Sequence, residues 1–256
     1  MANLVRFEVR DRIAHLTLDE PARRNALSRN MLAALRDALV QVAADRDVRV
    51  VIIDANGPAF SAGHDLRELA GASAEGATSL FALCTEVMEA IRALPQPVIA
   101  QVDGVATAAG CQLVATCDLA VASETATFAT PGVKIGLFCS TPAVALARVV
   151  PAKKGLEMLL TGAPISAAEA ERIGLVNRVV PKDRLAAETL SLAQQIVQAS
   201  GATVTLGKRA FHAQLSLDRP AAYAVAQHAM VENSQMHDAQ EGMAAFLEKR
   251  PPVWRD

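Results

Sequence analysis

The sequence has few aromatic residues, no long apolar run and no segregation of charges of one sign. Aromatic side chains make up 4% of its 256 residues, with one tryptophan and one tyrosine. The formal net charge is −2 and both signs are mixed throughout, whereas a nucleic-acid partner requires a basic face. No uncharged apolar run is as long as a bilayer-spanning helix. We therefore expect neither nucleic-acid binding nor a membrane span.

Several common site motifs are also missing. The chain contains no phosphate-loop, dinucleotide-fold or zinc-helix pattern. Its four cysteines (Cys84, Cys111, Cys117 and Cys139) have no C-x-x-C spacing, which favours small buried side chains for the first three. We therefore predict no metal site and no separate cofactor.

The first ten residues alternate like a β-strand. They lack the apolar stretch of a signal peptide, and they are not rich in Arg and Ser like a transit peptide. On this basis we predict a cytoplasmic protein.

The spacing of apolar residues predicts a mixed α/β fold. Residues 5–9 and 13–18 indicate a hairpin, and the apolar runs at 48–54, 97–102 and 118–123 indicate buried strands. Helices are predicted between the strands, one of them capped by Ser28, and helices dominate after about Pro142. We divide the chain into a core, residues 1–195, and a C-terminal helical region, residues 196–256.

Two small-residue turns follow two of these strands. One is Phe60-Ser61-Ala62-Gly63-His64-Asp65-Leu66, and the other lies within residues 101–113, where Gly104-Val105-Ala106-Thr107-Ala108-Ala109-Gly110 leads into a helix. Each turn can present a free backbone N–H group, and two such groups aimed at one oxygen form an oxyanion hole.

These turns and other motifs, in this order, resemble the enoyl-CoA hydratase/isomerase (crotonase) superfamily over nearly the whole chain. The matching segments are residues 24–27, 60–66, 104–118, 130–136, 160–162, 170–176 and 241–250. The stretch 128–142 is similar to the branch of enoyl-CoA-hydratase-domain-containing proteins. The resemblance implies a crotonase-like spiral of β-β-α units, a C-terminal trimerisation region, and a homotrimer or a hexamer made of two trimers.

The resemblance also implies an acyl-CoA thioester as substrate, with coenzyme A as part of that substrate. The backbone N–H groups of His64 and Ala109 match the pair that holds the thioester oxygen. Alanine is acceptable in this turn unless its φ is positive, which costs about 1–2 kcal/mol.

Two glutamates that serve hydratases of the superfamily as acid and base are replaced. Gln112 and Gly132 stand at their positions; an amide has no useful basicity, and glycine offers no side chain. We therefore predict a weak hydratase, and we expect that placing glutamate at both positions raises hydration.

Other residues could carry chemistry at this site. Cys139 or Ser140 could be a nucleophile, or could serve in packing and helix capping. The His64 side chain could be a base oriented by Asp65, or could line the CoA pocket beside a structural Asp65.

Contacts to CoA are implied by the same resemblance. They fall on Arg24, Ala26, Ala62, His64, Leu66, Phe246 and Lys249, with the last two acting from a neighbouring subunit. The resulting hypothesis is an acyl-CoA-binding, enoyl-CoA-hydratase-like enzyme. Its alternatives are a non-catalytic acyl-CoA-binding or regulatory protein, and another chemistry such as isomerisation, thioester hydrolysis or decarboxylation that uses His64, Cys139 or Ser140.

Overall fold

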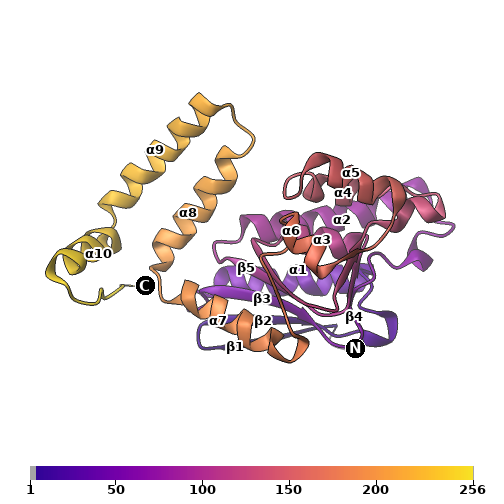
Figure 1. Ribbon diagram of the computed structural model, residues 1–256, viewed down its shortest axis with the longest axis horizontal. Coiled ribbons are helices and arrows are strands. Elements are labelled where there is room, and N and C mark those ends of the chain that lie inside the picture. Colours follow the sequence, from indigo (N-terminus) through magenta and orange to yellow (C-terminus); the bar gives the residue numbers. More distant parts are fainter. Residues whose placement is uncertain (1–3, 256) are drawn as a thin grey trace.

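The computed structural model describes residues 4–255, and its core is built on a six-stranded sheet (Figure 1). The strand order is β1-β2-β3-β5-β7-β10. The strands are β1 (Val5–Arg10), β2 (Ile13–Leu18), β3 (Val50–Ala55), β5 (Val98–Val102), β7 (Leu119–Ser123) and β10 (Arg178–Val180). β1 and β2 form the predicted antiparallel hairpin, and the other neighbours are parallel. Residues 1–3 of the predicted strand-like start lie outside the described part.

Helices cover both faces of this sheet. Val51 and Ile53 of β3 pack into a core shared with α1 (Arg29–Ala44) and α2 (Ala74–Ala93). Their neighbours Val50 and Ile52 face α7 (Leu185–Val197) on the other side. A strand buried on both faces has no polar side, which explains the continuous apolar run in the sequence.

A second, smaller sheet carries short strands in the order β4-β6-β8-β9. Its strands are β4 (Ala59–Ser61), β6 (Val105–Thr107), β8 (Thr127–Ala129) and β9 (Ile165–Ser166). Short helices follow or link these strands: η1 (Pro21–Arg23), η2 (Leu66–Glu68), α3 (Ala109–Thr116), η3 (Pro131–Ile135), α4 (Ser140–Leu146), α5 (Ala152–Thr161), α6 (Ala167–Arg172) and η4 (Lys182–Arg184). The alternation of strands and helices confirms the predicted mixed α/β fold.

The last three helices form an arm that projects away from the core (Figure 1). They are α8 (Gly201–Gln214), α9 (Arg219–Gln235) and α10 (His237–Glu248). α9 buries no residue, and large apolar side chains such as Tyr223, Met230 and Phe246 are 67%, 68% and 83% exposed. The predicted division at residues 195 and 196 stays a prediction; α7, which packs on the sheet, ends at Val197.

A buried charge cluster anchors the arm to the core. Lys208 of α8 lies 2.7 Å from Asp118, and its Nζ also donates to the carbonyl oxygens of Ile91 and Gln96. His212 Nε2 contacts the other oxygen of Asp118 at 3.0 Å, while the backbone N–H of Val98 donates to this carboxylate. The side chain of Lys208 is 7% exposed, so these contacts fix the first helix of the arm at the end of α3. In residues 4–255, no helix is both long and apolar enough to cross a membrane.

Candidate functional site

The smaller sheet brings the predicted site residues together. β4, β6 and β8 are parallel neighbours, so their carboxyl ends lie at one edge. The segment with His64 follows β4, the helix with Ala109 and Gln112 follows β6, and Gly132 follows β8. Residues from distant parts of the sequence therefore meet at this edge.

The turns after β4 and β6 are in direct contact. Gly63 has a φ of +82°, and a Cβ atom placed on it would lie 2.8 Å from the Cβ of Ala108 and 3.1 Å from the backbone nitrogen of Ala109. A Cβ atom on Gly110 would collide with the carbonyl oxygen of Ser61. Only glycine at both positions permits this approach of one turn to the other.

The two backbone N–H groups expected at the oxyanion hole are free. Ala109 is the first residue of α3, where an N–H group has no partner within the helix. Among residues 4–255, neither the N–H of Ala109 nor that of His64 has a hydrogen-bond acceptor. Two unpaired donors on adjoining turns suit a carbonyl oxygen that gains negative charge.

Ala108 holds the second turn in a conformation that favours glycine. Its φ is 51° and its ψ is −118°. The sequence did not reveal whether an alanine in this turn has a positive φ; Ala108, one residue before the donor Ala109, does. Backbone strain of this kind costs about 1–3 kcal/mol. Ala108 N donates to Ala129 O at 2.9 Å, which ties the strained turn to the end of β8.

The His64 ring is buried and oriented by the backbone rather than by Asp65. Its Nδ1 lies 3.2 Å from the carbonyl oxygen of Leu27, so Nδ1 carries the proton and Nε2 keeps its lone pair. Nε2 is buried without a partner in the described chain, and burial lowers the pKa of His64. Phe81 packs edge-on against the ring, with centroids 5.4 Å apart. Burial thus favours the neutral ring, in which Nε2 is an unpaired acceptor.

Asp65 instead belongs to a structural ion pair. Its carboxylate caps η2 by accepting from the N–H of Arg67 and lies 2.7 Å from the Arg67 guanidinium. The side-chain hydrogen bonds from Arg67 lower the pKa of Asp65 to about 2.

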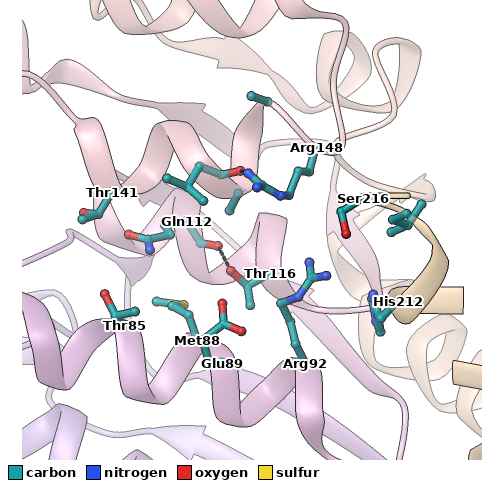
Figure 2. Close-up of a pocket in the computed structure, with 14 residues that line it drawn as sticks. Thr85, Met88, Glu89, Arg92, Gln112, Thr116, Thr141, Arg148, His212 and Ser216 are labelled. Atoms are coloured by element: carbon teal, nitrogen blue, oxygen red, sulfur yellow. Dashed lines mark hydrogen bonds between the residues drawn. The ribbon is translucent and has the colours of Figure 1, made fainter. Parts of the chain in front are cut away.

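Gln112 opens onto a cavity of about 730 Å³ between α2, α3, α4 and the end of α8 with the turn that follows it (Figure 2). Its side chain is nearly buried, and Oε1 has no partner in the described residues. The backbone oxygen of Gln112 accepts from the Thr116 hydroxyl at 2.8 Å. The amide can thus hold a water molecule or a polar ligand atom, but it cannot take a proton.

Gly132 has no room for a side chain. A Cβ atom there would lie 2.6 Å from the carbonyl oxygen of Leu137 and 2.8 Å from the sulfur of Cys139. Leu137 N donates back to Gly132 O at 2.9 Å, so the segment after η3 folds over this residue. The expectation that a glutamate at position 132 assists catalysis therefore conflicts with the structure, because the segment 137–139 occupies the space it needs.

Cys139 and Ser140 lack the partners of an activated nucleophile. Burial raises the pKa of the Cys139 thiol, and in the described chain no histidine or carboxylate is bonded to it. Ser140 is exposed at the start of α4, with its hydroxyl 3.4 Å from the carbonyl oxygen of Phe138. Neither shows the nucleophile–base contact that covalent catalysis requires.

The expected CoA-contacting loops lie side by side. Ala62 N donates to Arg24 O at 3.0 Å, and Leu27 N donates to Gly63 O at 2.8 Å. Leu66 and Arg24 are exposed beside this junction, and Ala26 is buried within it. Asn25, which sequence reasoning did not single out, is fully buried, with its amide nitrogen 2.8 Å from the oxygens of Asn56 and Ala59. The signal in the sequence that could have identified Asn25 is its position within the Arg24-Asn25-Ala26-Leu27 motif.

Phe246 and Lys249 do not join this site within one chain. Both lie at or just after the end of α10, at the opposite end of the molecule from β4 (Figure 1). Their predicted role requires a second subunit.

Comparison with known proteins identifies close relatives. The enoyl-CoA hydratase domain-containing protein 3, mitochondrial, of Rattus norvegicus is 54% identical over 245 residues, which cover 95% of this chain and 82% of the relative. The crystal structure of the human protein of that name has a TM-score of 0.96 at 50% identity and covers 98% of this chain and 100% of that one. An enoyl-CoA hydratase from Mycobacterium smegmatis has a TM-score of 0.97 at 50% identity, covering 99% of both chains. These matches confirm the crotonase-like spiral and the predicted branch.

The prediction of a cytoplasmic protein is wrong by the same comparison. The relatives from rat, mouse, zebrafish and human are all named mitochondrial. The prediction rested on the composition of the first ten residues, which differ from a transit peptide.

The whole-family comparison agrees with these individual matches. The model of the enoyl-CoA hydratase/isomerase family matches residues 8–256, nearly the full sequence. The chain belongs to the enoyl-CoA hydratase/isomerase family.

Proposed function

We propose that this protein binds an acyl-CoA thioester and polarises its carbonyl oxygen between the N–H groups of His64 and Ala109. The observation that carries the proposal is the pair of unpaired donors on adjoining turns at the end of the smaller sheet. A fixed hydrogen-bond donor at such an oxygen raises the reaction rate by a factor of about 10²–10³. The names of the relatives, which are enoyl-CoA hydratases or contain that domain, support a hydratase-like enzyme.

We expect this site to hydrate enoyl-CoA substrates slowly. Gln112 can orient a water molecule but cannot take its proton, and Gly132 has neither a carboxylate nor space for one. Loss of one general acid or base costs about 10²–10⁴ in rate. We expect crotonyl-CoA to be hydrated at least ~10²-fold more slowly than by a family member with both glutamates.

Proton exchange at the α-carbon is a second candidate activity. It is favoured by the unpaired Nε2 of His64, a buried lone pair on the same residue that supplies one N–H donor. In this step Nε2 takes the α-proton and the C–H electron pair moves to the thioester oxygen to give an enolate. Return of a proton to the α-carbon gives exchange, whereas with a 3-enoyl chain its delivery to the γ-carbon shifts the double bond and gives isomerisation.

One experiment separates these functions. The protein is incubated in D₂O with a panel of acyl-CoAs and enoyl-CoAs, and products are read by mass spectrometry, with binding measured by calorimetry. Deuterium uptake that is lost in His64→Phe, with binding retained, supports proton exchange. Fast hydration that is unaffected in Gln112→Ala contradicts the proposed weak hydratase. Binding without any turnover indicates the non-catalytic acyl-CoA-binding protein.

Nucleotide recognition and assembly complete the proposal. We expect a trimer or hexamer in solution, supported by the exposed apolar side chains of the arm. In such an assembly Lys249 of a neighbouring subunit binds the 3′-phosphate of CoA. Lys249→Ala should then weaken CoA more than dephospho-CoA in calorimetry, while equal losses, or a monomer by light scattering, would exclude this role.

A further inference from the structure

We propose that the cavity beside Gln112 takes acyl chains that end in a carboxylate, held between Arg92 and Arg148. This inference names the substrate class of the site and rests on the proposed acyl-CoA function. It starts from the two guanidinium groups among the side chains that line the cavity (Figure 2).

The cavity runs along α3 away from the oxyanion hole. Ala109 begins this helix, and Gln112 and Thr116 both line the cavity. Successive helical residues rise about 1.5 Å, so Thr116 lies roughly 10 Å beyond the Ala109 donor along the axis. An acyl chain whose thioester oxygen sits at the donors thus has a path of several methylene groups towards Thr116.

Two guanidinium groups meet that path from opposite walls. Arg92 comes from α2 and Arg148 from the turn after α4, and Figure 2 shows the Arg92 head on the far side of Thr116 from Gln112 and the Arg148 head across the cavity from Thr116. The side chain of Arg92 has no hydrogen bond or ion pair with any residue from 4 to 255. Arg148 donates through Nη1 to the carbonyl oxygen of Val144 at 2.7 Å, which leaves its other N–H groups available.

The charge on the lining is positive in balance. Glu89 is the one acidic residue among those that line the cavity, and it makes no ion pair within the described chain with either arginine. His212 also lines the cavity, but its Nε2 is bonded to Asp118, which is in turn paired with Lys208. Two guanidinium groups therefore face one free carboxylate.

This arrangement suits an anion at the end of an apolar chain. Met88, Val144 and Leu215 supply apolar wall along the cavity for methylene groups. Guanidinium groups bind carboxylates through paired, charge-assisted hydrogen bonds. A plain alkyl chain gains nothing from the two arginines, so they select for an acidic chain end.

The test compares chains that differ only at their far end. Affinities for suberyl-CoA, whose eight-carbon chain is long enough to pass Thr116, its carboxamide analogue suberamyl-CoA, octanoyl-CoA and free CoA are measured by calorimetry on the full-length protein. We expect suberyl-CoA to bind at least ~10-fold more tightly than suberamyl-CoA, with the ratio falling as salt rises. Arg92→Gln and Arg148→Gln should each reduce this ratio towards one and leave the affinity for free CoA unchanged.

Lys153→Gln is the matched control, since it removes one exposed positive charge at the start of α5 outside the cavity. It should preserve the ratio. Equal affinity for suberyl-CoA and suberamyl-CoA, or a ratio that survives in the double arginine variant, would overturn the inference. Tight binding of octanoyl-CoA in that case leaves the proposed function standing, whereas absence of binding by every CoA compound refutes both.

Discussion

Replacing Gly132 with alanine should destabilise the protein, although the change adds a single methyl group. The new Cβ atom would lie 2.6 Å from Leu137 O and 2.8 Å from Cys139 Sγ, well inside normal contact. Leu137 is held in place by its own hydrogen bond to Gly132, so the backbone must shift. Forcing an extra methyl into a packed site costs about 1–3 kcal/mol.

The assay is thermal unfolding of the wild type and variants at equal protein concentration. For a chain of this size, each kcal/mol shifts the midpoint by about 2–4 °C, so Gly132→Ala should lower it by roughly 2–12 °C. Gly76→Ala is the matched control, because its Cβ atom would meet Ser73 Oγ at 3.4 Å and Ala72 Cβ at 3.8 Å, both ordinary contacts. That change should stabilise by about 0.4–1 kcal/mol through the unfolded state.

The sulfur of Cys139 supplies a second check. In a Cys139→Ala background one of the two close contacts disappears, so Gly132→Ala should cost less there, while the clash with Leu137 O remains. The same packing predicts that Gly132→Glu adds no hydratase activity to Gln112→Glu. A Gly132→Ala protein as stable as the wild type, or a double glutamate variant that hydrates faster than Gln112→Glu alone, would refute this account of the site.

Three further changes test other parts of the structure. Ala108→Gly should raise stability by about 1 kcal/mol because it relieves the positive φ; a lower unfolding midpoint would mean that the lost methyl contact outweighs the strain. Lys208→Met should lower the free energy of unfolding, measured with denaturant, by about 3–5 kcal/mol, because it leaves the Asp118 carboxylate without its ammonium partner. The double variant with Asp118→Asn should recover part of this loss. Arg67 lowers the pKa of Asp65 from 3.8 to about 2, so the ionised Asp65 stabilises the fold above pH 4 and this effect is lost as the pH falls towards 2. The difference in unfolding free energy between the wild type and Asp65→Asn should therefore close between about pH 4 and pH 2. A difference that stays constant would contradict the ion pair.

The local sequence predicted the elements that depend on local physics. The hairpin of β1 and β2, the Ser28 cap and the strands buried on both faces all follow from apolar spacing and turn chemistry. The positions of His64 and Ala109 on adjoining turns followed from the order of motifs in the family. The hairpin and the cap depend on neighbours in the sequence, whereas the adjoining turns were expected from the resemblance alone.

Features that depend on distant segments could not be read from the sequence. The lack of space at Gly132 arises because residues 137–139 fold back over it, and the sequence shows only a glycine. Arg92 lies in α2 and Arg148 in the turn after α4, and nothing in their sequence neighbours indicates that they share a cavity. The φ of Ala108 is set by the pairing of its turn with β8, whereas alanine in general favours the right-handed region.

The anchor at Asp118 has a consequence for how the arm and the cavity depend on each other. His212 and Leu215 of the arm form one wall of the cavity, while α2 and α4 of the core form the others. A ligand that touches both sides binds only the docked state of the arm, so ligand affinity and docking are thermodynamically linked, each strengthening the other by the same free energy. Slower hydrogen exchange in α8 on ligand binding would report this linkage, and variants that loosen the anchor would weaken binding of long acyl chains without any change in the residues that touch the thioester.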